Sequence, residues 1–281
     1  SVPRHPYEGT HQLWNIKKTK FDAEENQVLD NEWVIFTGID EKRFAEDFVE
    51  ASDKMAYLSW SSYDKVQKLL LVRAVKLGAH ECAARTFDCL FVEAISSIGL
   101  RWELKVRGSA SCDNAVGSKR PDCQWRPKKL HNGPGNDWPS GVLEVTLSGS
   151  PGKLASDIRY WLLQASSVAN FVLAMEIERH RPQITLEKWT RKSDLGSPCR
   201  EQVITIGNRD GIPIVHGGPL VIEFEKIIRH SPRTQDERDI QVSTNDLEYL
   251  AINVRDEQGF PAVYPETPSS EILEETSEDE E

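Results

Sequence analysis

The sequence lacks any hydrophobic run near the ~18 residues that a membrane-spanning helix requires, so no membrane partner is expected. It also lacks paired cysteines, because its five cysteines are odd in number and form no C-x-x-C motif. This pattern favours small reduced thiols over a disulfide framework. No secretory signal pattern is visible either. We therefore expect an intracellular protein of the cytoplasm or nucleus.

Several motifs that carry chemistry are also missing. The seven histidines form no H-x-x-x-H pair, which argues against a zinc site. The glycine-rich stretch 207–218 lacks the G-K-[ST] ending of a phosphate-binding loop, and we expect a hairpin turn there. No G-x-S-x-G motif supports acyl transfer. A function therefore has to be sought among carboxylates and basic residues.

Positive charge is scarce and unevenly distributed. The net charge is −11, but residues 266–281 hold eight acids and no base, which leaves −3 for the rest of the chain. No broad positive field is present, so binding of nucleic acid would need a local basic patch. The acidic composition of residues 261–281 predicts a disordered tail.

With 281 residues, 38% of them apolar, the chain can bury a substantial core. We expect residues 1–31 to form an N-terminal arm and residues 32–260 to form a single α/β domain. The domain begins with a strand pattern and then helix patterns: a strand at 32–37, a helix capped by Asp40, a helix at 61–78 with Val66 on its apolar face, and a helix at 82–98.

The pattern then changes to strands interrupted by one helix. We expect strands at 101–106, 122–125 and 142–147, an amphipathic helix at 150–165, strands at 170–177, 184–189 and 202–206, and a final helix at 245–254. This order predicts a layered α/β fold with a mixed sheet.

Two acids stand out on successive predicted strands. Asp122 begins one strand and Glu144 lies in the middle of the next. Two such carboxylates, with the backbone carbonyl of Val145, can hold Mg²⁺ or Mn²⁺ through oxygen ligands. The metal could then polarise a phosphodiester and activate water. The alternative is that both acids are solvated or salt-bridged, because acids at strand ends are common.

The wider order of motifs resembles the PD-(D/E)XK nuclease-like superfamily, which has the restriction-endonuclease-like fold. It resembles more closely a set of uncharacterised fungal proteins of that superfamily. The matching residues are Pro-Asp at 121–122, Val-Leu-Glu-Val at 142–145, Ser-Gly-Ser at 148–150, Leu-Ala-Ser-Asp at 154–157, Trp-Leu at 161–162 and the apolar strand at 172–177. The resemblance implies a mixed sheet flanked by helices, with an N-terminal helical layer.

The sequence departs from that superfamily at one position. The lysine that the resemblance implies would stand at Thr146. Such a lysine positions the attacking water and offsets developing charge, which threonine cannot do. Some relatives carry the cation on the following helix, where Lys153 and Arg159 are the candidates. The alternative for both is an ordinary solvated helix charge.

A local basic cluster could contact phosphate groups. It lies beside the predicted site and consists of Arg120, Arg126, Lys128 and Lys129. One hypothesis is thus a divergent metal-dependent nuclease acting on DNA or RNA. The other is a nuclease-fold module without catalysis that binds protein or nucleic acid, and a structural protein without a site is a third. The sequence does not predict an oligomeric state.

Overall fold

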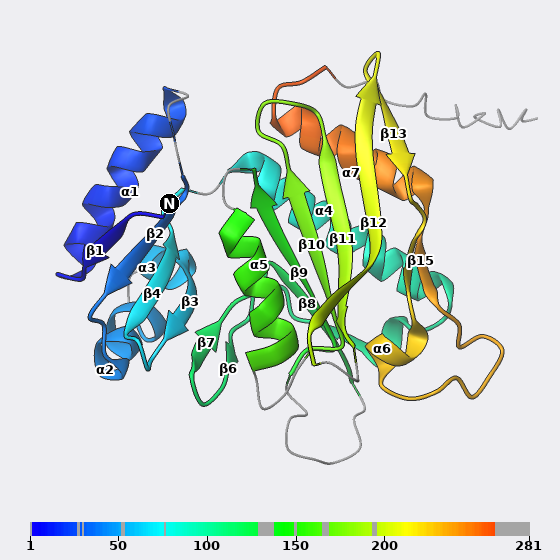
Figure 1. The fold of residues 1–281 in the computed structure, drawn as a ribbon, viewed down its shortest axis with the longest axis horizontal. Coiled ribbons are helices and arrows are strands. Elements are labelled where there is room, and N and C mark those ends of the chain that lie inside the picture. The colour runs from blue at the N-terminus through cyan, green and yellow to red at the C-terminus, as the bar shows by residue number, and fades with distance from the viewer. Residues whose placement is uncertain are drawn as a thin grey trace, which may run out of the picture.

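The computed structural model describes residues 2–261 except 27–28, 30, 52–53, 76, 129–137, 149–150, 165–168 and 193–195. This part of the chain forms two large β-sheets side by side, with helices packed against each (Figure 1). A short third sheet pairs β14 (Leu220–Ile222) with β15 (Ile240–Val242). No helix in these residues combines the length and the apolar character needed to cross a membrane. The predicted fold class, a mixed sheet flanked by helices, is confirmed.

The larger sheet has seven strands in the order β13-β12-β11-β10-β9-β8-β5. Their bounds are β5 Leu104–Val106, β8 Cys123–Pro127, β9 Gly141–Leu147, β10 Phe171–Ile177, β11 Ile184–Arg191, β12 Pro198–Arg209 and β13 Ile212–His216. Only β9 and β10 run parallel; the other neighbouring strands are antiparallel. The crossover between β9 and β10 is α5 (Pro151–Arg159), continued by a π-helical turn at Tyr160–Gln164.

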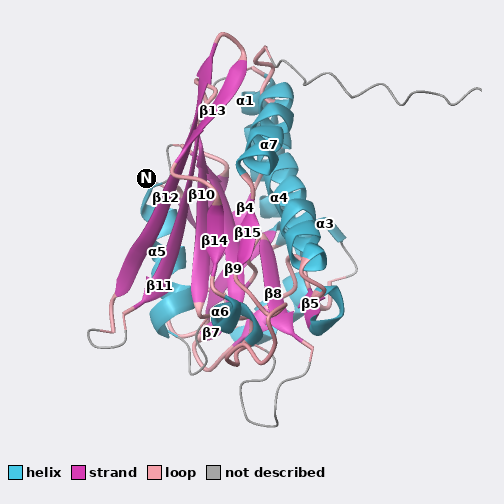
Figure 2. Ribbon diagram, turned by 90° about the vertical axis from the view of Figure 1, so that its right-hand side faces the viewer, coloured by secondary structure: helices cyan, strands magenta, loops and turns pink. Residues whose placement is uncertain are grey.

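Helices cover both faces of this sheet (Figure 2). One face packs on α4 (Gly78–Ser97) and α7 (Thr244–Glu257), and the other packs on α5. Because side chains alternate along a strand, Leu143 and Val145 of β9 join the α4 side, whereas Val142 packs with Trp161 on the α5 side. Glu144 is two residues from Val142 on the same strand, so its side chain lies on the same face and points toward α5. A short helix, α6 (Phe224–Ile228), lies beyond β14.

The smaller sheet has six strands in the order β1-β2-β4-β3-β7-β6. Their bounds are β1 Arg4–Pro6, β2 Trp33–Thr37, β3 Trp60–Asp64, β4 Leu69–Arg73, β6 Cys112–Asp113 and β7 Gly117–Lys119. Its helices are α1 (Thr10–Glu25), α2 (Glu41–Phe44) with a π-helical turn at Ala45–Val49, and α3 (Lys54–Ser59). Asp40 caps α2 as predicted, and its side chain accepts a hydrogen bond from the Arg43 amide.

Two sequence predictions in this region are wrong. The helix expected at 61–78 is instead β3 and β4, which pair antiparallel around a turn. Leu70 and Val72 are buried at a spacing of two, and Val66, expected in the core, is 72% exposed in that turn. In addition, the strand expected at 101–106 begins only at Leu104, after a 3₁₀ turn at Arg101–Glu103. The pairing of β4 with β2 and of β5 with β8 determines the structure in these two places. No local sequence pattern reveals that pairing.

Other predicted elements agree with the structure. The stretch 207–218 contains the β12–β13 hairpin turn, and Ser243 caps α7 with a reciprocal bond to Asp246. The segment expected to be an arm contains β1 and α1, and Leu13 of α1 packs into the core of the smaller sheet. Residues 262–281, where the acidic tail was predicted, lie outside the described residues.

Candidate functional site

The two acids singled out in the sequence lie on neighbouring strands at the junction of the two sheets. Asp122 immediately precedes β8, and its amide donates to the Leu143 carbonyl of β9 at 3.1 Å. Glu144 follows Leu143 and projects to the opposite side of the strand. The neighbouring elements therefore bring the two residues together, but each carboxylate has its own set of partners.

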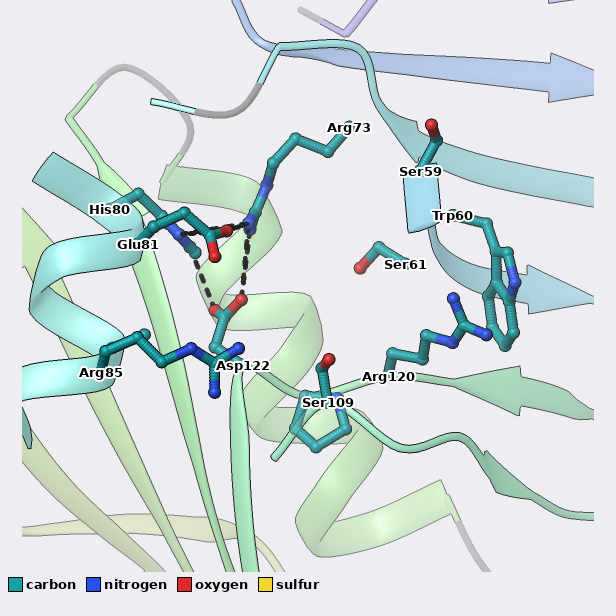
Figure 3. A pocket seen from close by; sticks show the side chains of 12 residues that line it. Ser59, Trp60, Ser61, Arg73, His80, Glu81, Arg85, Ser109, Arg120 and Asp122 are labelled. Carbon is teal, nitrogen blue, oxygen red and sulfur yellow. Dashed lines mark hydrogen bonds and ion pairs between the residues drawn. The ribbon is translucent and has the colours of Figure 1, made fainter. Parts of the chain in front are cut away.

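Asp122 is held by groups from α4, β4 and β9 (Figure 3). Its Oδ2 accepts a hydrogen bond from the Val145 amide at 2.7 Å and lies 3.2 Å from Nε2 of His80. Its Oδ1 lies 3.4 Å from the Arg73 guanidinium. Burial acts to raise the pKa of Asp122, but His80 and Arg73 act against burial and bring it far below its ordinary value.

His80 also contacts the third predicted metal ligand. Its Nε2 lies 3.1 Å from the carbonyl oxygen of Val145, so this nitrogen faces two oxygen acceptors and carries a proton. Burial and Arg73 act to lower the pKa of His80, whereas Asp122 and Glu81 raise it, and the result lies above the ordinary value. An imidazole thus occupies the space between the Asp122 carboxylate and the Val145 carbonyl.

Glu144 belongs to a buried cluster of two acids and two lysines on the α5 side. Trp161 donates its indole N–H to Glu144 Oε1 at 2.6 Å, and the ammonium groups of Lys119 and Lys153 each lie 3.6 Å from the carboxylate. Asp157 bonds both lysines, at 2.6 Å to Lys119 and 2.5 Å to Lys153. Every member of this cluster is buried.

The pKa values in this cluster follow from burial and pairing. Burial raises the pKa of Glu144, and Asp157 raises it further. Burial also acts to raise the pKa of Asp157, but Lys119 and Lys153 lower it more. Burial acts to lower the pKa of Lys119, which Asp157 and Glu144 raise above its ordinary value. Lys119 is therefore held charged, with Asp157 as its main counter-charge.

Lys119 reaches this cluster because of a glycine. It lies on β7, and Gly117 at the start of that strand packs against β3. A Cβ at position 117 would lie 1.9 Å from the carbonyl oxygen of Tyr63, so any other residue would push the strands apart. Lys153, Asp157 and Trp161 come from successive turns of α5 and its π-helical extension.

Trp33 of β2 links the two groups of charges. The Arg73 guanidinium carbon lies 4.5 Å from the centre of the indole ring, and the Lys153 ammonium lies 4.4 Å from it. Both cations are thus within cation–π distance of one buried ring. The smaller sheet therefore covers the predicted site and supplies part of its charge.

The predicted helix cations have different surroundings. Lys153 reaches Glu144, whereas Arg159 is exposed and lies in a groove with Glu176 and Glu187. Thr146, which stands where the superfamily lysine would be, is buried, and its hydroxyl donates to the Leu147 carbonyl at 3.3 Å. Within the described residues, no hydrogen bond or ion pair joins Arg159 to Asp122 or Glu144.

The predicted basic cluster divides into two places. Arg120 stacks on the rings of Trp60 and Tyr57, with its guanidinium carbon 3.9 and 4.3 Å from the ring centres. Arg126 and Lys128 lie at the other end of β8, near the edge strand β5. Lys129 lies outside the described residues.

Three residues of the site were missed by sequence reasoning: Arg73, His80 and Lys119. Arg73 lies in the stretch 61–78 where a helix was expected, and His80 forms no spacing motif with another histidine. Lys119 stands two residues before Pro121, and its position in that Lys-x-Pro-Asp run was the only local signal.

These residues do not fit a divalent cation with oxygen ligands. Such an ion needs about six oxygens with free lone pairs. Each oxygen of Asp122 and Glu144 instead faces an N–H or a cationic group of the protein. In the described part of the chain, no group of three or more His, Cys, Asp or Glu side chains could hold a metal.

Comparison with known proteins finds distant likeness among solved structures. No family model matches the chain, and no curated protein matches it. Among solved structures, a protein from Anabaena variabilis, described as a candidate nuclease of the DUF820 family, is 14% identical. The match covers 68% of this chain and 90% of that one, with a TM-score of 0.36. A likeness of this size carries no argument about function, and the fold class rests on the elements described above.

The buried cluster predicts strong coupling between Lys119 and Asp157. Lys119→Met or Asp157→Asn alone leaves an unmatched charge, and each should lower the free energy of unfolding by about 3–5 kcal/mol. The double variant removes one charge of each sign and leaves Lys153 with Glu144. Urea unfolding should therefore give a double-variant loss at least about 1 kcal/mol smaller than the sum of the single losses. Additive losses would contradict the coupling.

The depressed pKa of Asp122 predicts a pH dependence of stability. The unfolded carboxyl takes up its proton near its ordinary pKa of about 4, and the folded one only at lower pH. The stabilisation is thus complete above about pH 5 and is lost as the pH falls below about 4. Asp122→Asn should cost about 3 kcal/mol at pH 7. Urea unfolding at pH 7 and pH 3 should show the difference from wild type shrinking, and a constant difference would refute it.

Proposed function

We propose that the chain is a nuclease-fold module that binds nucleic acid without hydrolysing it. The observation that carries this proposal is that the cations of the protein itself surround both predicted metal-binding acids. Asp122 is paired with Arg73 and His80, and Glu144 is bonded to Trp161 and neighboured by two lysines. A metal ion would have to displace these groups at the cost of leaving buried cations unpaired.

The surroundings of Lys153 also argue against a lysine that assists hydrolysis. A catalytic lysine must hold the attacking water or the developing charge with a free ammonium hydrogen. Lys153 instead donates to Asp157 at 2.5 Å and lies over the ring of Trp33. Thr146 carries no charge and is buried. The geometry thus favours the non-hydrolytic hypothesis over the enzyme hypothesis.

The nucleic-acid contact is best supported at the edge of the larger sheet, where five residues form what we call the basic edge. They are Arg101, Trp102, Lys105, Arg126 and Lys128. Trp102 is 74% exposed, with the Lys128 ammonium 5.1 Å and the Arg101 guanidinium 5.8 Å from its ring centre. Lys105 on the edge strand β5 is the direct cross-strand partner of Arg126.

This arrangement suits a single strand. An exposed indole can stack on an unpaired base, and flanking cations can contact the adjacent phosphates. The chain has a net charge of −11, so such binding depends on this local patch and not on a general field. Of the predicted phosphate-binding residues, Arg126 and Lys128 belong to the basic edge, and Arg120 does not.

The absence of hydrolysis can be tested with labelled single- and double-stranded DNA and RNA. We expect no cleavage that depends on Mg²⁺ or Mn²⁺, by either the wild type or Glu144→Ala. Calorimetric titration with Mn²⁺ should give no saturable heat, because the acids are already paired. Metal-dependent cleavage by the wild type that Glu144→Ala abolishes would overturn the non-hydrolytic proposal.

Binding can be measured by fluorescence anisotropy with labelled single-stranded DNA and RNA over a salt series. Trp102→Ala should weaken binding about tenfold through lost stacking, and Lys128→Glu should reduce the salt dependence. Phe21→Ala and Lys42→Glu are matched controls, since both residues are exposed on the helices of the smaller sheet. Equal effects of test and control variants, or no binding at all, would exclude the basic edge as the contact surface.

A further inference from the structure

A small polar cavity lies at the junction of the two sheets, on the solvent side of Asp122 (Figure 3). Its volume is about 80 Å³. Trp60 and Ser61 of β3 and Arg120 form one wall, and Arg85 of α4 lies on the other side of Asp122. Arg85 and Ser109 are exposed and mark its mouth. The basic edge contributes none of the lining residues.

The charges that line this cavity do not balance. Its two carboxylates, Glu81 and Asp122, are already paired: Arg73 lies 3.8 and 3.4 Å from them, and His80 lies 3.2 Å from Asp122. Two further guanidinium groups remain, those of Arg85 and Arg120. Neither forms an ion pair with any described residue. The lining therefore holds excess positive charge.

Arg120 in particular is a partly buried cation that forms no ion pair with a described acid, and only the more distant charge of Asp113 acts on it. Its side chain is stacked on Trp60 and Tyr57, and its hydrogen-bond partner is the backbone carbonyl of Tyr57. Burial lowers the pKa of this guanidinium, because no carboxylate lies close enough to compensate fully for the lost water. A desolvated cation of this kind is stabilised when an anionic ligand binds beside it.

The uncharged polar groups and guanidinium nitrogens of the lining are mainly hydrogen-bond donors. In the described part of the chain, buried atoms without a hydrogen-bond partner include Nε of Arg73, Nε of Arg120 and Nε1 of Trp60. All three are donors of residues that line the cavity, but the atoms themselves are closed to solvent, so they make the wall electropositive without contacting a ligand directly. The serines at the wall and mouth, Ser61 and Ser109, can donate as well. A complementary ligand must supply acceptors and negative charge.

We propose that this cavity binds a terminal phosphate group, held by Arg85 and Arg120. A phosphate presents several acceptor oxygens, and guanidinium groups match that geometry with paired N–H donors. The cavity has room for about five water molecules, which suits the phosphate group but not a whole nucleotide. The remainder of the ligand would extend past the mouth. The phosphate could belong to a small monoester or to the 5′ end of a strand, and the site does not depend on the basic edge.

The site can be tested by calorimetric titration of the full chain with inorganic phosphate, with acetate as the carboxylate comparison. We expect saturable binding of phosphate and none of acetate. Arg85→Gln should weaken phosphate binding about tenfold, and because Arg85 is exposed this variant should fold. Arg181→Gln, which removes an exposed arginine in the turn before β11, should have no effect. No saturable binding up to about 10 mM phosphate, or equal losses in both variants, would overturn the proposal.

A second experiment identifies the source of the phosphate. Anisotropy compares an oligonucleotide carrying a 5′-phosphate with the same oligonucleotide carrying a 5′-hydroxyl. Tighter binding of the phosphorylated strand, lost in Arg85→Gln, supports a strand terminus as the ligand. Equal binding of the two strands, with inorganic phosphate still bound, supports a small monoester. Trp102→Ala distinguishes this site from the basic edge. This variant should weaken the binding of both oligonucleotides and leave the binding of inorganic phosphate unchanged.

Discussion

The buried carboxylate of Glu144 is the constraint on which the centre of this molecule depends. It projects from the middle of β9, a strand in which every residue is buried. A carboxylate there without donors would cost several kcal/mol. Trp161 supplies a direct hydrogen bond, and Lys119 and Lys153 supply positive charge. Asp157 then becomes necessary, because two lysines beside one acid would leave a buried positive charge.

The same constraint joins the two sheets. Lys119 belongs to β7 of the smaller sheet, and Arg73, which holds Asp122, belongs to β4 of that sheet. Trp33 of β2 lies against cations from both groups. A further ion pair, between Glu32 and Arg179 at 2.5 Å, crosses the junction. Separating the sheets would remove Arg73 from Asp122 and Lys119 from Glu144 and Asp157, so this packing is electrostatic as well as apolar.

The sequence predicts the parts of this arrangement that are encoded locally. The apolar strands β9 and β10 and the amphipathic helix α5 carry their own patterns, and they place Glu144 near Lys153. The region 61–78 was misassigned because a short apolar run fits either a helix or a strand, and only pairing with β2 decides between them. Arg73 reaches Asp122 from β4 through that pairing, Lys119 reaches Asp157 from β7, which pairs with β3, and His80 reaches Asp122 from α4. Apart from the i, i+4 pair of Lys153 and Asp157 on α5, no spacing along the chain indicates which cation meets which acid.

The distribution of cations determines what the chain can bind. Around Asp122 and Glu144 the positive groups are engaged by the acids, so they neither leave room for a metal nor present charge to a ligand. Positive charge that is not engaged in this way lies further out, at Arg85 and Arg120 beside the cavity and at Lys105 and Lys128 on the basic edge. The buried acids of this fold are neutralised by cations of the protein itself. The fold can still have affinity for phosphate, because phosphate binding depends on other cations that are not paired with those acids.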